Sequence, residues 1–181
     1  TDITDMTMDA DGRVRNVKFK PIDMGDELNV FINVYVMKKS LLQNIVMDSI
    51  SHNRRHFLTD VIAGCLDSMK IYGYEHKGFY AGITSLQAYY NSNMSILKEE
   101  NRHELFGDRS VFTKIRDSAP TKYGNGAVVK NSMIADGCII EGEVENSIIF
   151  RNVKVGRGTV VKNSIIMQNT VLGENSTINC I

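Results

Sequence analysis

The side chains best suited to acid–base chemistry near neutral pH are four histidines, which are His52, His56, His76 and His103. No group of histidines, cysteines and carboxylates has the spacing of a metal site. Asp9-Ala-Asp-Gly12 resembles half of a calcium-binding loop, but the distal glutamate is missing and a hairpin turn is the better interpretation. His56 beside Arg54 and Arg55 is either an anion site or the solvated start of a helix. The individual residues therefore indicate no catalytic centre.

A repeated phrase organises the last third of the chain. Val129-Lys-Asn-Ser-Met-Ile134 recurs as Val144-Glu-Asn-Ser-Ile-Ile149, 15 residues later, and as Val161-Lys-Asn-Ser-Ile-Ile166, 17 residues after that. Such a hexapeptide pattern is typical of a parallel β-helix, whose triangular coils point one aliphatic and one small residue inward from each side. No histidine lies in this region, which excludes a histidine-based acyl transfer inside the coils.

The repeat predicts which residues fill and which residues turn the β-helix. We expect six aliphatic side chains inside it, namely Ile134, Ile140, Ile149, Val155, Ile166 and Leu172. Asn131, Asn146 and Asn163 fall at equivalent corners and should stack as a ladder. Asparagine tolerates the left-handed backbone of a tight corner, and its amide can bond to the copies above and below it. A ligand-binding role for these asparagines is the alternative.

Composition limits the class of protein. The chain has 181 residues, enough for one or two domains. Lys plus Arg and Asp plus Glu both number 21, which argues against nucleic acid or an anionic membrane as a partner. No apolar run approaches the length of a membrane span. Three scattered cysteines, with no paired framework, fit a reducing compartment and predict a cytoplasmic protein.

Residues 1–108 are expected to alternate strands and helices, without a glycine-rich phosphate loop. Residues 109–123 are an expected extended linker, because Pro120 excludes a helix there, and 124–181 the β-helix domain. A start inside a hairpin suggests a piece of a longer α/β protein. The expected elements are a hairpin over 6–19, a buried strand over 28–36, helices over 38–50 and 57–69, strands over 71–83, a helix opened by a capping box at 84–87, and a charged loop over 98–104.

Three stretches carry a resemblance to a known family. They are Ser118-Ala-Pro-Thr-Lys-Tyr, Val128-Val-Lys-Asn-Ser, and Val153-Lys-Val-Gly-Arg-Gly with Ile166-Met-Gln. They resemble the C-terminal part of bacterial glucose-1-phosphate adenylyltransferase (ADP-glucose pyrophosphorylase), and most closely its GlgD type, the partner subunit found beside the catalytic one in Gram-positive bacteria. The resemblance implies part of an α/β nucleotidyltransferase domain followed by a left-handed parallel β-helix. The family makes ADP-glucose from ATP and glucose 1-phosphate for glycogen synthesis, with Mg²⁺, as a tetramer.

The resemblance also allows the family's working residues to be compared one at a time. Lys20 matches the lysine of Phe-Val-Glu-Lys-Pro that holds the sugar phosphate, but Phe19 replaces the acid. Phe31 replaces the serine of Ser-Met-Gly-Ile-Tyr. Arg55-His56-Phe57-Leu58 stands where catalytic members have His-Asp-Phe-Gly. Gly82 replaces the metal-binding aspartate of Trp-Arg-Asp-Val-Gly-Thr.

These replacements decide the functional expectation. Phosphoryl transfer depends on metal ions that neutralise charge and on fixed phosphates. We therefore expect no catalytic residue, no metal ligand and no cofactor in this chain, with Mg²⁺ confined to catalytic members and Lys20 as the one candidate substrate contact. The expected role is a regulatory or assembly subunit that pairs with a catalytic subunit or with itself through the β-helix. The alternatives are a catalytic subunit and a generic hexapeptide scaffold or transferase.

Overall fold

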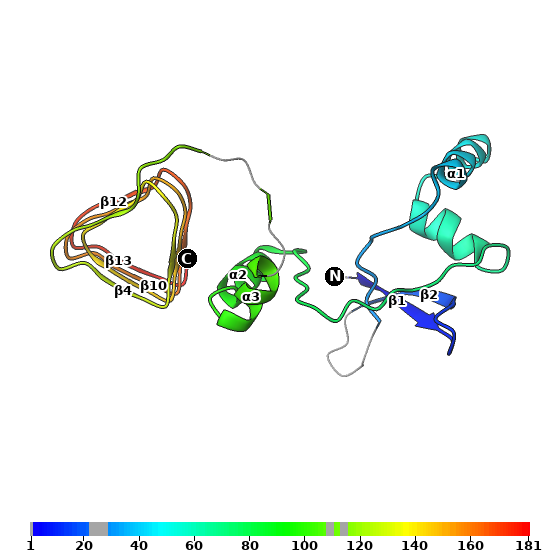
Figure 1. Cartoon of the computed structure of the whole chain (residues 1–181), viewed down its shortest axis with the longest axis horizontal. Helices are drawn as coiled ribbons and strands as arrows, with labels where there is room; N and C mark the ends of the chain where they lie inside the picture. Colours follow the sequence, from blue (N-terminus) through cyan, green and yellow to red (C-terminus); the bar gives the residue numbers. More distant parts are fainter. Residues whose placement is uncertain (1, 22–28, 108–110, 113–115) are drawn as a thin grey trace. The chain divides into compact units, whose positions relative to one another are not determined.

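The computed structural model describes residues 2–21, 29–107, 111–112 and 116–181, and it forms two compact units, Thr1–Lys77 and Gly78–Ile181. The first unit holds a hairpin and short helices, and the second holds two helices and a β-helix (Figure 1). The domain limits at 108 and 123 that the sequence suggests stay predictions.

The β-helix is built from three parallel sheets, and the expected coil architecture is confirmed. Its strands run in the order β13-β10-β7-β4, β11-β8-β5 and β12-β9-β6-β3, so each strand pairs with its counterparts in adjacent coils. The handedness of the coil stays a prediction. The strands are β3 (Lys122–Tyr123), β4 (Val128–Lys130), β5 (Met133–Ile134), β6 (Ile139–Ile140), β7 (Glu143–Glu145), β8 (Ile148–Ile149), β9 (Lys154–Val155), β10 (Val160–Lys162), β11 (Ile165–Ile166), β12 (Val171–Leu172) and β13 (Thr177–Asn179).

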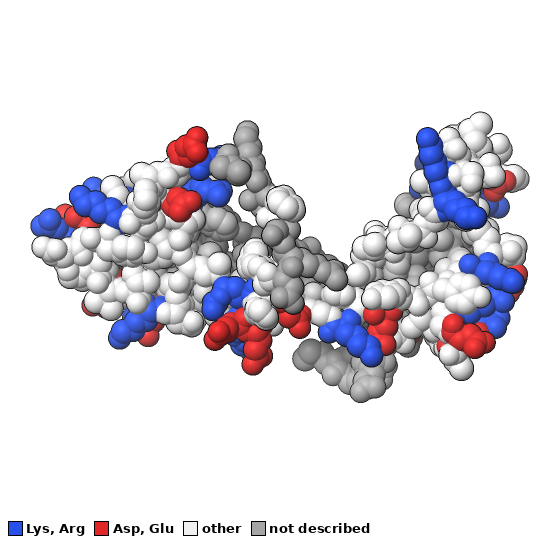
Figure 2. Space-filling view, in the orientation of Figure 1, with Lys and Arg blue, Asp and Glu red and all other residues white. Residues whose placement is uncertain are grey.

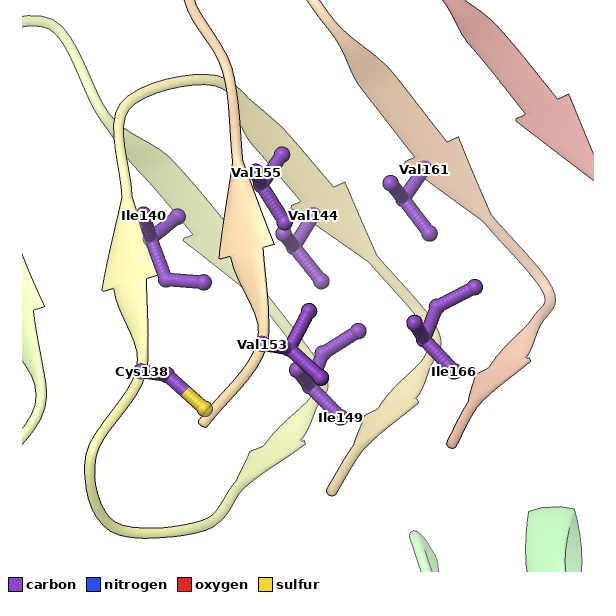
Figure 3. Close-up of a cluster of buried hydrophobic side chains, with 8 residues drawn as sticks. All are labelled: Cys138, Ile140, Val144, Ile149, Val153, Val155, Val161 and Ile166. Carbon is purple, nitrogen blue, oxygen red and sulfur yellow. The ribbon is translucent and has the colours of Figure 1, made fainter. Parts of the chain in front are cut away.

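The core of the β-helix consists of the predicted aliphatic residues and of small residues between them. Ile140, Ile149, Val155 and Ile166 are at most 5% exposed, and they pack with the others of their cluster in Figure 3. Ile134 and Leu172 pack against the same cluster but are only partly buried. Each of the two lies in an outermost described coil and so has a neighbour on one side only. The predicted interior is confirmed.

The asparagine ladder is also confirmed. Asn131, Asn146 and Asn163 have φ values of 42°, 47° and 46°, in the left-handed region. The Nδ2 atom of Asn131 donates to Oδ1 of Asn146 at 3.0 Å, and that of Asn146 donates to Oδ1 of Asn163 at 2.6 Å. The ladder continues to Asn179 at 3.1 Å. The side-chain amides thus link successive coils along one edge of the triangle, in the way that stacked amides do in cross-β structures.

The serine of each phrase stabilises the same corner from inside. The side chains of Ser147 and Ser164 are fully buried. The hydroxyl of Ser147 donates to the carbonyl oxygen of Glu145 at 2.7 Å and accepts the Ser164 N–H at 3.1 Å. Because buried polar groups must be hydrogen-bonded, a hydroxyl that both donates and accepts is well placed here. Asn-Ser therefore recurs because its two side chains join adjacent coils, one on the outside and one on the inside.

The coils differ in length at a single corner. Two residues, Glu141 and Gly142, connect β6 to β7, whereas four residues, 156–159, connect β9 to β10. This accounts for spacings of 15 and then 17 residues in the repeated phrase. A Cβ atom on Gly142 would overlap the carbonyl oxygen of Thr159 in the next coil. The short corner therefore requires glycine for close approach, not for its φ angle.

Two helices precede the β-helix in the second unit. Helix α2 (Leu86–Ser95) begins as expected, although its cap is Ser85, whose hydroxyl accepts the Ala88 N–H at 3.0 Å, and not Thr84. The charged loop expected over 98–104 is wrong, because α3 (Glu99–Phe106) is helical there. Glu99 and Glu100 lie in its first turn, where negative side chains stabilise a helix. The high charge of this segment suggested a loop, although its first two glutamates favour the start of a helix.

The first unit confirms the hairpin and the first helix. Strands β1 (Asp2–Met8) and β2 (Val14–Pro21) pair antiparallel, and α1 spans Lys39–Ser51. The Asp9 carboxylate accepts the Arg13 N–H at 2.9 Å and the Arg15 Nε–H at 2.7 Å, so Asp9 closes a hairpin turn, as expected. The helix expected over 57–69 is correct in place but irregular, with a π-helical turn η1 (Phe57–Ile62) and a 3₁₀ turn η2 (Ala63–Cys65).

The further strands expected over 28–36 and 71–83 do not form among the described residues. Only isolated bridges occur, Asp5 with Val30 and Arg13 with Tyr72. Val34 and Val36 are 66% and 98% exposed, although their run of β-branched residues predicts a buried strand. Such a strand needs neighbours on both sides, and the described residues supply one hairpin edge. The expectations over 28–36 and 71–83 are therefore wrong, with Leu28 outside the described residues.

The ladder predicts that replacing Asn146 lowers the free energy of unfolding more than replacing Asn175, an asparagine of similar backbone conformation. Asn146→Gly keeps the left-handed φ accessible but removes two side-chain hydrogen bonds, at about 0.5–1.5 kcal/mol each. Chemical denaturation followed by circular dichroism should show a loss of about 1–3 kcal/mol in the free energy of unfolding.

Asn175→Gly is the matched control, because Asn175 also has a left-handed φ, 54°, and its side chain makes no hydrogen bond with any described residue. Equal losses in the two variants would show that the side-chain ladder does not stabilise the fold.

Candidate functional site

Lys20, the candidate sugar-phosphate contact, lies in β2 and pairs with Ile3 of β1. Its side chain is outside the described residues, so the contact stays a prediction. Phe19, directly before it, is 48% exposed. A large aromatic ring thus stands at the surface where catalytic members of the resembled family carry an acid.

The segment 31–35 combines a left-handed residue with an aromatic cluster. Asn33 has a φ of 61°, in the left-handed region, at the position of the glycine in Ser-Met-Gly-Ile-Tyr. Tyr35 packs edge-on against Phe31, with ring centroids 5.1 Å apart, and against Phe57, at 4.9 Å. Burial raises the pKa of the Tyr35 hydroxyl. Where catalytic members have a serine hydroxyl, this chain has an aromatic cluster.

The possible anion site at Arg54, Arg55 and His56 is already occupied by the chain's own groups. The Oδ2 atom of Asp60 accepts the backbone N–H groups of His56 and Arg55, both at 2.9 Å. Arg54 pairs with Asp48 at 2.8 Å. The bond from the His56 N–H, followed by those from Arg55 and from the Thr59 hydroxyl, lowers the pKa of Asp60 to about 2. Asp60 therefore takes the place that an external anion would need.

The metal-ligand position of the resembled family has no carboxylate. Gly82 lies in a segment without helix or strand, 80–85, and a Cβ atom there would lie 3.0 Å from the Tyr80 hydroxyl. Within the described ranges, no three His, Cys, Asp or Glu side chains are close enough to hold a metal ion. The segment 79–85 itself contains no carboxylate that a metal ion could use.

Two hollows at the described surface are open to solvent. The two best-defined hollows lie along α3, and the first is lined by Lys98, Glu99, Glu100 and His103, all exposed. On the face shown in Figure 2, basic and acidic side chains are interspersed. Among the described residues, no helix is long and apolar enough to cross a membrane.

One contact that the sequence interpretation missed joins α2 to the β-helix. Ile148 and Ile165 point outward from their sheet, yet each is only 8% exposed, because they pack with Leu97, Tyr90 and neighbouring residues at α2. The Tyr90 hydroxyl also donates to the carbonyl oxygen of Asn163 at 2.6 Å. The sequence contained a sign of this contact, because each phrase ends in two consecutive apolar residues. One of the two points out of the β-helix and is expected to pack against another part of the protein.

Asp60 gives a pH-dependent prediction. Its folded pKa, about 2, lies below the ordinary value of 3.8, so its stabilising effect is complete above pH 3.8 and is lost as the pH falls through about 2. An NMR titration of the carboxyl carbons should place Asp60 near 2. Thr59→Val removes one hydrogen-bond donor and should raise this pKa part of the way to 3.8. A titration of Asp60 near 3.8 in the unmodified protein would show that the N–H bonds are absent in solution.

Comparison with known proteins shows which families this chain resembles. Residues 118–181 match the family model of the GlmU-like C-terminal hexapeptide. The chain is 37% identical to the glycogen biosynthesis protein GlgD of Bacillus subtilis over 71% of its own length and 37% of that protein. It is 41% identical to GlgD of Geobacillus stearothermophilus over 71% of its length and 38% of that protein. It is 30% identical to glucose-1-phosphate adenylyltransferase of Desulfitobacterium hafniense over 96% of its length and 47% of that protein.

The chain therefore spans less than half of the length of these relatives. The similarity nevertheless extends well beyond the β-helix, since residues 118–181 are only the C-terminal part of the matched length. These comparisons confirm the resemblance to the glucose-1-phosphate adenylyltransferase family, and over most of its length the chain is a relative of the GlgD glycogen biosynthesis proteins.

Proposed function

We propose that this chain is part of a GlgD-like subunit of glucose-1-phosphate adenylyltransferase that regulates or assembles with a catalytic subunit and does not itself make ADP-glucose. The observation that carries the proposal is Gly82, which stands where catalytic members have a metal-binding aspartate. Without that carboxylate, the charge of the phosphates is not neutralised by a metal held at this point. Phe31 and Phe19 support the proposal, because each replaces a polar residue of the same site.

The proposed partner is a catalytic glucose-1-phosphate adenylyltransferase subunit, or a second copy of this chain, in the cytoplasm. The names of the relatives support the first choice. The β-helix is the proposed contact surface. On the outer side of the sheet β12-β9-β6-β3, Ile139 and Val171 are 39% and 71% exposed and offer two separate apolar contacts to a partner, with the exposed Lys154 between them in the register. In the sheet β13-β10-β7-β4, by contrast, Lys162 and Glu145 pair with each other at 2.8 Å.

An activity assay tests the proposal. With ATP, glucose 1-phosphate and Mg²⁺, the purified chain should form no ADP-glucose above a control without enzyme. A catalytic glucose-1-phosphate adenylyltransferase subunit, assayed alone and with increasing amounts of this chain in its full-length form, should change its turnover or its response to effectors. Turnover by the full-length chain alone would support the alternative of a catalytic subunit. Co-elution of this chain with the catalytic subunit, without any change in turnover, would support a role in assembly and exclude one in regulation.

Lys20 provides a separate prediction about substrate. We propose that it retains weak affinity for a sugar phosphate, by resemblance to the catalytic members. In NMR titrations of the chain with glucose 1-phosphate, Lys20→Ala should weaken binding at least several-fold, because a charged contact to phosphate is lost. Lys18→Ala removes the same charge two residues earlier in β2 and should leave binding unchanged. Equal effects of the two substitutions would mean that only the net charge matters.

A further inference from the structure

The loop 79–85, which contains Gly82, is held at both ends by helices of its own compact unit. At its start, the Phe79 N–H donates to the carboxylate of Glu104 in α3. At its end, the Ser85 hydroxyl caps α2. The loop belongs to the compact unit Gly78–Ile181, together with the β-helix. The conformation of the loop therefore depends on where α2 and α3 are fixed.

Helix α3 is fixed to α2 by two side-chain bonds. The Nδ2 atom of Asn101 donates to the carbonyl oxygen of Ser95 at 2.9 Å, and a guanidinium nitrogen of Arg102 donates to that of Leu97 at 3.3 Å. Ser95 is the last residue of α2 and Leu97 follows two residues later, where backbone carbonyls have no partner inside the helix. The two helices thus move together, and the loop is attached to this pair.

Helix α2 is in turn fixed to the β-helix by one apolar contact and one directional bond. The apolar contact covers Ile148 and Ile165, on the outside of the sheet β11-β8-β5. Apolar burial is non-directional and would let a helix slide or rotate on this surface. The Tyr90 hydroxyl, bonded at 2.6 Å to the carbonyl oxygen of Asn163, sets one position. This carbonyl belongs to a corner that the asparagine ladder already holds rigidly.

We propose that the β-helix determines the position of the loop 79–85 through α2, with Tyr90 as the positioning residue. A partner subunit or a ligand that displaces the β-helix then also displaces this loop. The inference rests on the proposed function in one respect. The loop matters because its counterpart in catalytic relatives carries the metal-binding aspartate. In the proposed non-catalytic subunit, the β-helix and the loop 79–85 thereby stay physically connected.

Amide hydrogen exchange, followed by mass spectrometry on the whole chain, tests the proposal without substrate or partner. Tyr90→Phe removes the hydroxyl and keeps the ring, and exchange in residues 79–90 should become about two- to tenfold faster, the effect expected for one lost hydrogen bond. Tyr89→Phe is the matched control, because Tyr89 packs in the same cluster and its hydroxyl has no bond to a described residue. Its exchange should match that of the unmodified protein. Glu104→Gln should also accelerate exchange, but mainly at 79–82.

Two outcomes would overturn the inference. One is unchanged exchange in 79–90 when Tyr90 is replaced by phenylalanine, which would show that apolar packing alone fixes the helix. The other is an equal acceleration across the whole range 78–181, which would make Tyr90 a contributor to global stability. Neither outcome bears on the proposed function, because the absence of ADP-glucose synthesis is measured in a separate assay.

Discussion

The second unit depends on one geometric constraint, which is that every coil must turn its corners without moving out of register with the coil beside it. The Asn-Ser corners use a left-handed backbone, which costs an ordinary L-residue about 1–2 kcal/mol. Asparagine lowers this cost and adds a side-chain bond to the next coil, as Asn146 does on both sides. Serine fixes the same corner from inside. Once the corners are set, the aliphatic residues of all coils fall one above another, and the core fills.

This constraint explains why the β-helix could be predicted from sequence and much of the first unit could not. Each coil repeats the same local rules and takes its partners from the adjacent coils, so position in the phrase decided burial, strand pairing and the ladder. The segment 29–36 has a strong strand pattern, but a strand also needs neighbours that lie far away in sequence. The charges of 98–104 gave the opposite error, since Glu99 and Glu100 favour the helix start that their polarity concealed.

Much less of the candidate site could be read from chemistry alone. Lys20, Phe31 and Gly82 acquire meaning only through their resemblance to family phrases, since nothing in their spacing suggests a shared site. The structure adds the conformation and the contacts of the residues around these positions. Asn33 has a left-handed φ of 61°, and the aromatic rings of Tyr35 and Phe57 pack edge-on with centroids 4.9 Å apart. Asp60 occupies the amides that an anion could have used.

The short corner at Glu141 and Gly142 has an evolutionary consequence. Because side chains alternate between the two faces of a strand, the loss of one residue within a strand would turn the rest of that coil inside out. The loss of two residues at a corner leaves all three sheets in register, and only a side chain at Gly142 becomes intolerable. Lineages of this protein should therefore gain and lose residues at corners and not within strands. Alignments that spread such gaps across the strands would misplace the interior of every following coil.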